Sequence, residues 1–186
     1  MPGRLTEKST SGHKKMLLDY TIHKPAVMDA YKLHQMVAGL FNSDRDPPLF
    51  CDRGDNIVVR TTRELSGVNK DAVPVPIIIE GEVRVIELRA SCFVSSGGKK
   101  IFLKPGDWKA RHEWLRKKGA RHGFEVLTVN CISKTIKIQK PGAPFVLDQT
   151  DFTATIKILD QPKFNNALKV GVGAKGRAFG FGLLIV

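Results

Sequence analysis

Residues 171–186, GVGAKGRAFGFGLLIV, hold five glycines and two basic residues and end on four apolar residues. The glycines are Gly171, Gly173, Gly176, Gly180 and Gly182, and the basic residues are Lys175 and Arg177. Glycine allows positive φ and lets an anion approach backbone N–H groups, so the run could bind phosphate ahead of a last strand. It could equally be a glycine-lined turn before an edge strand. It is not a Walker loop, since GxxxxGK[ST] is absent, nor a dinucleotide-binding fingerprint, since no helix follows.

Two helices are predicted in the stretch that leads to this run. Residues 160–170, DQPKFNNALKV, form the nearer one, with Asp160 as its N-cap and Pro162 in its first turn. Residues 107–118 form the other, and Gly119 is placed to end it. Strands are predicted over residues 14–23, 48–51, 56–63, 73–94 with a break at Glu80-Gly81, 124–132, 133–140, 152–159 and 181–186.

A further helix covers residues 26–41, where apolar residues recur at three- and four-residue steps and Pro25 is placed in the first turn. The order of helices and strands is typical of an α+β protein with tandem ferredoxin-like (RRM-like) domains and a C-terminal glycine-rich loop. We therefore expect a flexible tail over residues 1–13, an N-terminal domain over 14–80 and a C-terminal domain over 81–186.

The charge of the chain favours a polyanionic partner. Its 30 Lys and Arg residues against 18 Asp and Glu give a net charge of +12 in 186 residues, and nucleic acid is the usual partner of such a domain. No apolar run approaches the ~18–20 residues that cross a bilayer, so we expect no membrane association. The three cysteines are far apart and match no disulfide or metal pattern, which is consistent with a cytoplasmic location.

A Tyr–His pair is predicted on the first helix. In YKLH, Tyr31 and His34 are three residues apart and therefore neighbours on one helix surface. Histidine titrates near neutral pH and a phenol can donate a hydrogen bond to an oxyanion, so the pair could serve proton transfer. The simpler alternative is a histidine at the border of the core.

Basic residues are concentrated in residues 99–121. They are Lys99, Lys100, Lys104, Lys109, Arg111, Arg116, Lys117, Lys118 and Arg121. Residues two turns apart on a helix form positive stripes that can follow RNA phosphates, while Trp108 and Leu115 could anchor the opposite side. Core packing is the expected role of Trp114. The five histidines show no metal-ligand spacing, so we expect neither a metal nor another cofactor.

Three segments together resemble the CRISPR RNA-processing endoribonucleases of the type I-E (Cascade) form, within the RAMP superfamily. They are YKLHQMVAGLF after the first strand, VIELRAS in the middle and GVGAKGRAFGFGLLIV at the end. The resemblance spans nearly the whole chain from about residue 14. It implies metal-independent cleavage at the 3′ base of a CRISPR repeat stem-loop, with 2′,3′-cyclic phosphate and 5′-OH ends and retention of the hairpin. It also implies catalytic roles for Tyr31, His34 and Arg177, with Lys175 as the alternative to Arg177.

The chain departs from that family at LRASC, where Leu-Arg-Ala-Asn-Pro is common, and at PLFCD, where the family strand is FLFR. The implied partners are CRISPR repeat stem-loop RNA and other subunits of an effector complex. An alternative is a subunit of the same fold that binds repeat RNA without cutting it. A basic ribosome-associated protein would explain the charge and leave the Tyr–His pair unexplained.

Overall fold

The computed structural model describes residues 16–25, 28–41, 48–65 and 72–186, and the predicted tail over residues 1–13 lies outside them. In chain order the elements are β1 (Leu18–His23), α1 (Ala30–Gly39), β2 (Leu49–Asp52), β3 (Asn56–Thr61), β4 (Ala72–Pro74), β5 (Val83–Ala90), β6 (Phe93–Ser96), β7 (Lys99–Phe102), α2 (Trp108–His122), β8 (Phe124–Ile138), β9 (Phe145–Ile158), α3 (Gln161–Val170), the 3-10 helix η1 (Arg177–Phe179) and β10 (Leu184–Ile185).

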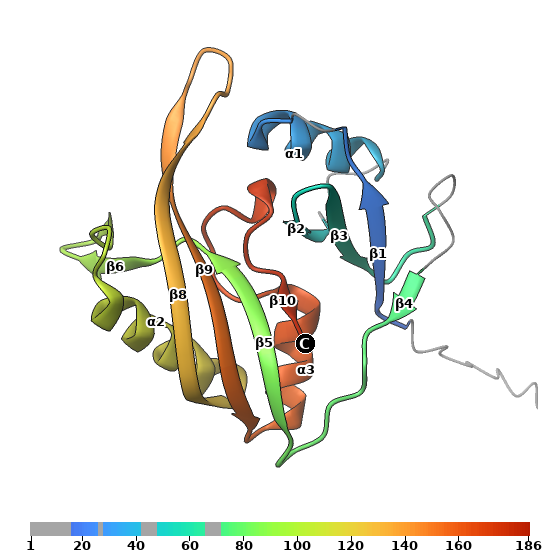
Figure 1. The fold of residues 1–186 in the computed structure, drawn as a ribbon, viewed down its shortest axis with the longest axis vertical. Helices are drawn as coiled ribbons and strands as arrows, with labels where there is room; N and C mark the ends of the chain where they lie inside the picture. The colour runs from blue at the N-terminus through green and yellow to red at the C-terminus, as the bar shows by residue number, and fades with distance from the viewer. Residues whose placement is uncertain (1–15, 26–27, 42–47, 66–71) are drawn as a thin grey trace, which may run out of the picture.

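These elements build two four-stranded antiparallel sheets that lie side by side (Figure 1). The N-terminal sheet has the order β2-β3-β1-β4, and the C-terminal sheet has the order β10-β5-β9-β8. Each order places the first and third strands of its sheet, counted along the chain, at the centre, which is the ferredoxin-like arrangement; β6 and β7 form a separate two-stranded sheet. The predicted fold class is therefore confirmed. The domain boundary that we propose after residue 80 falls between β4 and β5.

The C-terminal unit is held by a core between its sheet and the helices α2 and α3. Trp114 of α2 stacks on Phe152 of β9 with ring centroids 5.9 Å apart, and Phe124 meets Phe164 of α3 edge to face. The expected core role of Trp114 is thus confirmed. The buried core of the N-terminal unit is formed by α1, β2, β3 and the segment just after α1. It comprises Leu33, Val37, Phe41, Phe50, Ile57 and Val59.

The boundaries of several elements differ from those predicted. Helix α1 begins at Ala30 rather than after Pro25, because Asp29 Oδ1 accepts hydrogen bonds from the N–H groups of Tyr31 and Lys32. Residues 124–138 form one continuous strand with a bulge near Val126, not two strands. The third helix, with Asp160 capping Lys163 and Pro162 in the first turn, matches its prediction.

Gly119 does not end α2, because the helix runs on to His122 and Gly123 adopts the left-handed C-cap conformation. Gly119 lies inside the helix, where an added Cβ would be only 2.5 Å from the carbonyl oxygen of Phe124. Glycine is required there by close packing of α2 against the following strand.

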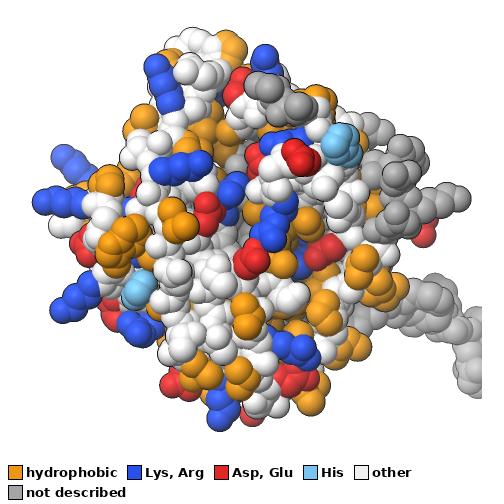
Figure 2. All heavy atoms as spheres, viewed as in Figure 1, with side chains coloured by type: hydrophobic (Ala, Val, Ile, Leu, Met, Phe, Trp, Pro, Cys, Tyr) orange, Lys and Arg blue, Asp and Glu red, His pale blue; other side chains and the backbone are white. Residues whose placement is uncertain are grey.

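The two units are joined through the C-terminal segment and β2. Leu183 packs on Leu49 and Cys51 of β2, while Phe181 packs with Ile138 and Leu147 of the long β8–β9 hairpin. On the face shown in Figure 2, acidic and basic side chains intermingle where the sheets meet, and Lys24–Asp52, Arg53–Glu87 and Arg89–Asp151 form ion pairs. In the described part of the chain, no helix is long and apolar enough to span a membrane.

Candidate functional site

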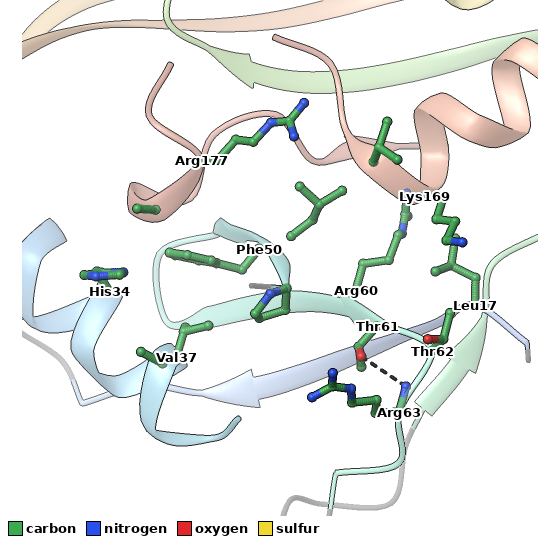
Figure 3. A pocket seen from close by; sticks show the side chains of 15 residues that line it. Leu17, His34, Val37, Phe50, Arg60, Thr61, Thr62, Arg63, Lys169 and Arg177 are labelled. Carbon is green, nitrogen blue, oxygen red and sulfur yellow. Dashed lines mark hydrogen bonds between the residues drawn. The ribbon is translucent and has the colours of Figure 1, made fainter. Parts of the chain in front are cut away.

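A pocket of about 330 Å³ lies between the two units (Figure 3). The N-terminal unit contributes residues from α1, β2 and the end of β3, and the C-terminal unit contributes the end of α3 and η1. Its lining comprises Leu17, His34, Val37, Ala38, Pro48, Leu49, Phe50, Arg60, Thr61, Thr62, Arg63, Lys169, Val170, Arg177 and Ala178. Four of these are Arg or Lys, and none of the described lining residues is acidic. The pocket is therefore suited to an anionic ligand.

The pocket brings together His34 and Arg177, which are far apart in the sequence. His34 lies on α1, and its ring is tilted against that of Phe179, with centroids 5.6 Å apart. Arg177 and Phe179 both belong to η1, so the contact between α1 and η1 fixes the spacing of the two polar groups. The imidazole is only partly buried, which leaves it open to a ligand in the pocket.

Tyr31 lies beside this pocket rather than in its lining. Its ring centroid is 6.4 Å from that of His34, with the ring planes 52° apart. The ring packs against a cluster of buried residues, Ile138, Leu147 and Phe181. Tyr31 thus connects α1 to the β8–β9 hairpin and the C-terminal segment, next to the candidate proton-transfer group.

The glycine-rich run presents Arg177, and not Lys175, to the pocket. Gly176 and Gly180 adopt φ of +82° and +84° and bracket η1, so the chain turns tightly at both ends of this short helix. The Nε–H of Arg177 donates a hydrogen bond to the carbonyl oxygen of Gly173 at 2.9 Å. This bond ties the guanidinium group to the glycine-rich loop itself, and in Figure 3 the side chain extends away from His34.

The glycines of this run are required by packing against the protein itself. A Cβ on Gly176 would lie 2.3 Å from the ring of Phe181, and one on Gly171 would lie 2.7 Å from the carbonyl oxygen of Gly182. A Cβ on Gly180 would approach the Phe50 ring to 3.0 Å. Gly171, Gly173 and Gly182 also have positive φ. The run is thus a tight turn packed on β2, from which Arg177 reaches the pocket lining.

Positive charge is concentrated where α2 approaches Arg177. Burial and the nearby Arg121 and Arg177 lower the pKa of Lys118, and burial together with Lys118, Arg177 and Arg121 lowers the pKa of His122. These shifts have the sign expected when cations crowd together without enough counter-charge. Burial is the larger cause of both shifts, and the neighbouring cations, whose repulsion a bound polyanion would relieve, add to it.

Arg111 is a correction to the predicted basic surface. It is completely buried, and its guanidinium group forms two hydrogen bonds of 2.7–2.8 Å with the carboxylate of Asp148. It also donates to Thr150 and to the carbonyl oxygens of Leu103 and Lys104. Arg111 therefore fastens the segment before α2 to β9, and its charge is not available to RNA phosphates.

The other predicted basic residues remain accessible on two elements. Lys99 and Lys100 are exposed on β7, where Lys100 lies over the ring of Phe93. Lys109, Arg116, Lys117 and Arg121 are exposed on α2, Lys104 precedes it, and Lys118 is half-buried above Trp114. Trp108, expected to anchor the helix, is 46% exposed, whereas Leu115 is buried. Figure 2 shows Lys and Arg side chains projecting on the side of α2 and the β6–β7 hairpin.

Sequence reasoning missed the pocket residues at the other end of the site from His34. Lys169 lies in the last turn of α3. Thr61 is the last residue of β3, and Thr62 and Arg63 come directly after it. Arg60 forms part of the wall and is ion-paired with Asp19. No local motif marks these residues, because only the approach of the two units makes them neighbours. Among the described residues, no group of three or more His, Cys, Asp or Glu side chains could hold a metal ion.

Comparison with known proteins shows the fold and gives a family-model match to the second half of the chain. A family model described as "CRISPR associated protein" matches residues 97–186. Thermus thermophilus Cse3 bound to an RNA representing a pre-cleavage complex superposes with a TM-score of 0.76 at 19% identity, over 91% of this chain and 98% of that chain. The CRISPR endoribonuclease Cse3 bound to a 19-nucleotide RNA gives a TM-score of 0.72 at 20% identity, over 91% and 97% of the two chains.

A chain of the Escherichia coli Cascade complex bound to double-stranded DNA gives a TM-score of 0.54 at 19% identity, over 90% of this chain and 95% of that chain. A search among curated proteins gave no match. The resemblance predicted from the sequence is confirmed at the level of fold and family model: residues 97–186 match the CRISPR associated protein family, and the chain as a whole has the fold of the Cse3 endoribonuclease.

Proposed function

We propose that this protein is an endoribonuclease of CRISPR RNA maturation, which cuts the repeat at the 3′ base of a stem-loop and stays bound to the hairpin. The observation that carries the proposal is the shared pocket of His34 and Arg177 in a chain with the Cse3 fold. A proton-transfer group and a cation from two separate units converge on one surface that lacks acidic residues in its described lining. Its partners are then repeat stem-loop RNA and other subunits of an effector complex, as the likeness to a Cascade chain supports.

The reaction that these groups serve is an internal phosphoryl transfer. The ribose 2′ oxygen attacks the adjacent phosphorus while its proton passes to the neutral imidazole of His34. The bond from phosphorus to the 5′ oxygen breaks, and that oxygen takes up a proton. The products are a 2′,3′-cyclic phosphate and a 5′-OH, so no water and no electrons are consumed. Histidine suits this role because its pKa lies near the working pH.

Arg177 and Tyr31 act on the charge that develops during this transfer. The guanidinium of Arg177, held by the bond to Gly173, can stabilise the non-bridging oxygens of the phosphate. The phenol of Tyr31, next to His34, can donate a hydrogen bond to an oxygen of the reacting group. The exposed basic residues of α2 and β7 would hold the phosphates of the stem, which A-form RNA presents on its outer surface.

The test is single-turnover cleavage of a CRISPR repeat hairpin RNA. With excess protein in EDTA, we expect cleavage of the all-ribose RNA and none when the nucleotide before the cut carries a 2′-deoxyribose. His34→Ala should slow cleavage by about two to four orders of magnitude, the usual loss for a general acid or base, and should leave hairpin affinity nearly unchanged. Gln35→Ala, an exposed neighbour on α1 outside the pocket, is the matched control.

A second candidate function is binding of repeat RNA without cleavage. The exposed basic residues of α2 and β7 favour it, since they would grip an RNA stem without any reacting group. Cleavage by His34→Ala at the wild-type rate under saturating protein would reject the catalytic assignment. Tight hairpin binding by a wild-type protein that never cuts would establish this second function. Activity lost in EDTA and restored by Mg²⁺ would reject the metal-independent mechanism.

A further inference from the structure

We propose that the pocket between the two units binds the base of the first unpaired nucleotide on the 3′ side of the stem. The inference rests on the proposed function for the identity of the RNA, and it assigns to the pocket a task separate from proton transfer. The pocket then helps to fix where the strand is cut, because a captured base holds the neighbouring phosphate in place.

The composition of the pocket is that of a nucleotide site. Its lining combines the apolar side chains of Val37, Leu49, Phe50 and Val170 with the cationic side chains of Lys169 and Arg177. A nucleotide within an RNA strand has a base with flat apolar faces and a phosphate on each side. The apolar lining residues match the faces of the base, and the cationic ones match the phosphates. The volume of about 330 Å³ is at the small end of ligand pockets, which span roughly 300–1,000 Å³. It therefore suits one base rather than a helical segment.

Polar groups at the end of β3 can read the edge of such a base. Thr61 Oγ1 accepts a hydrogen bond from the N–H of Arg63 at 3.1 Å, which leaves its hydroxyl proton to be donated. Thr62 adds a second hydroxyl group to the lining, on the side away from His34 (Figure 3). A base inserted between these hydroxyls and Val170 would have its phosphate toward the other end of the pocket, where His34 and Arg177 lie.

The walls of the pocket are held in place before any ligand binds. The buried guanidinium of Arg60 makes two bonds of 2.7 Å to Asp19 and one of 2.7 Å to the carbonyl oxygen of Leu184. Arg60 therefore connects β3 of the N-terminal unit to β10 of the C-terminal unit. A preformed site loses less conformational freedom on binding than one that must close.

The occupant follows from the position of the cut. Bases within the stem are paired and stacked, so taking one out costs pairing and stacking energy, whereas an unpaired base can be taken up at a smaller cost. A cut at the 3′ base of the stem has paired nucleotides before it and unpaired nucleotides after it. The base that the pocket can take most readily is therefore the first one on the 3′ side.

The experiment compares three RNAs: the intact repeat hairpin, one with an abasic site at the first unpaired 3′ nucleotide, and one with an abasic site at the last stem nucleotide before the cut. Loss of one stacked base weakens single-strand binding by roughly 5- to 150-fold, and we expect a fall in kcat/KM of that size for the 3′ abasic RNA. The same RNA with 2-aminopurine at this nucleotide should change its fluorescence on binding, whether or not cleavage follows.

Val170→Trp enlarges a side chain of the pocket lining, and Asn166→Trp places the same side chain on an exposed part of α3 outside the pocket. Val170→Trp should lower kcat/KM on intact RNA, cause no further loss on the 3′ abasic RNA and abolish the 2-aminopurine change. Asn166→Trp should behave as wild type.

Equal cleavage of intact and 3′ abasic RNA, or a loss confined to the abasic site before the cut, would overturn the pocket assignment and leave the proposed nuclease function intact. A protein that cuts no RNA yet changes the 2-aminopurine signal, with loss of that change in Val170→Trp, would support the pocket and refute the nuclease.

Discussion

Arg60 joins the two units through its buried guanidinium group, which pairs with Asp19 of its own sheet and donates to carbonyl oxygens of α3 and β10. Replacing Arg60 with methionine should therefore weaken the contact between the units. The side chain of Arg60 is 1% exposed and that of its partner Asp19 is 22% exposed. Both carboxylate oxygens accept hydrogen bonds of 2.7 Å, and the carbonyl oxygens of Leu184 and Leu168 accept further bonds of 2.7 and 3.4 Å. Methionine keeps much of the side-chain volume but leaves these acceptors without their donor.

The expected loss follows from those contacts. Removing one partner of a fully buried ion pair costs roughly 3–5 kcal/mol. Asp19 can be partly rehydrated where it is exposed, so we expect about 3 kcal/mol, the lower end of that range. For a urea m-value of about 2 kcal/mol/M, the midpoint of unfolding should fall by about 1.5 M. Arg60→Met combined with Asp19→Asn should be less destabilised than Arg60→Met alone, because no buried charge is left unpaired.

Urea unfolding should be followed by two probes. Both tryptophans, Trp108 and Trp114, are in the C-terminal unit, so their fluorescence reports that unit while far-UV circular dichroism reports both. The transitions should coincide in the wild type and diverge in Arg60→Met. Arg53→Met is the matched control, because Arg53 pairs with Glu87 of the other unit, and both side chains of that pair are more than 40% exposed. Such surface pairs contribute about 0–1 kcal/mol. A loss below 1 kcal/mol in Arg60→Met, equal to that in Arg53→Met, would refute the buried-clamp interpretation.

Four further predictions concern the basic residues and His122. Arg177→Ala should slow single-turnover cleavage by about 10- to 1,000-fold through lost stabilisation of the phosphate charge, while Lys175→Ala should change the rate less than threefold; the reverse order would place Lys175 at the phosphate. Arg116→Ala should reduce the slope of log affinity for the hairpin against log salt by about 1. Arg111→Met should instead lower the melting temperature, and an unchanged melting temperature would show that its buried pair is not stabilising. Hairpin RNA should raise the pKa of His122 in an NMR titration, because the polyanion offsets the cations that now lower it; a pKa that stays fixed on binding would place the RNA elsewhere.

The sequence by itself determined the features that depend on local interactions. The third helix begins at Asp160 because that side chain caps the N–H of Lys163 and Pro162 fits the first turn, and all three residues lie within four positions of one another. The glycine run predicted a turn ahead of the last strand, since positive φ is a property of single residues. The order of helices and strands was enough to predict tandem ferredoxin-like units.

Only the tertiary structure decided the features that depend on a partner distant in sequence. Gly119 satisfies the pattern of a helix end, but its role is set by contact with Phe124. The charge of Arg111 suggested a place on the predicted RNA-binding surface, yet the side chain is buried and paired with Asp148 on β9. A buried guanidinium group needs a charged partner, and this partner lies outside the helix of Arg111. His34, Arg177 and Lys169 line one pocket because the N-terminal and C-terminal units pack against each other. Local periodicity and residue spacing do not encode how two units pack.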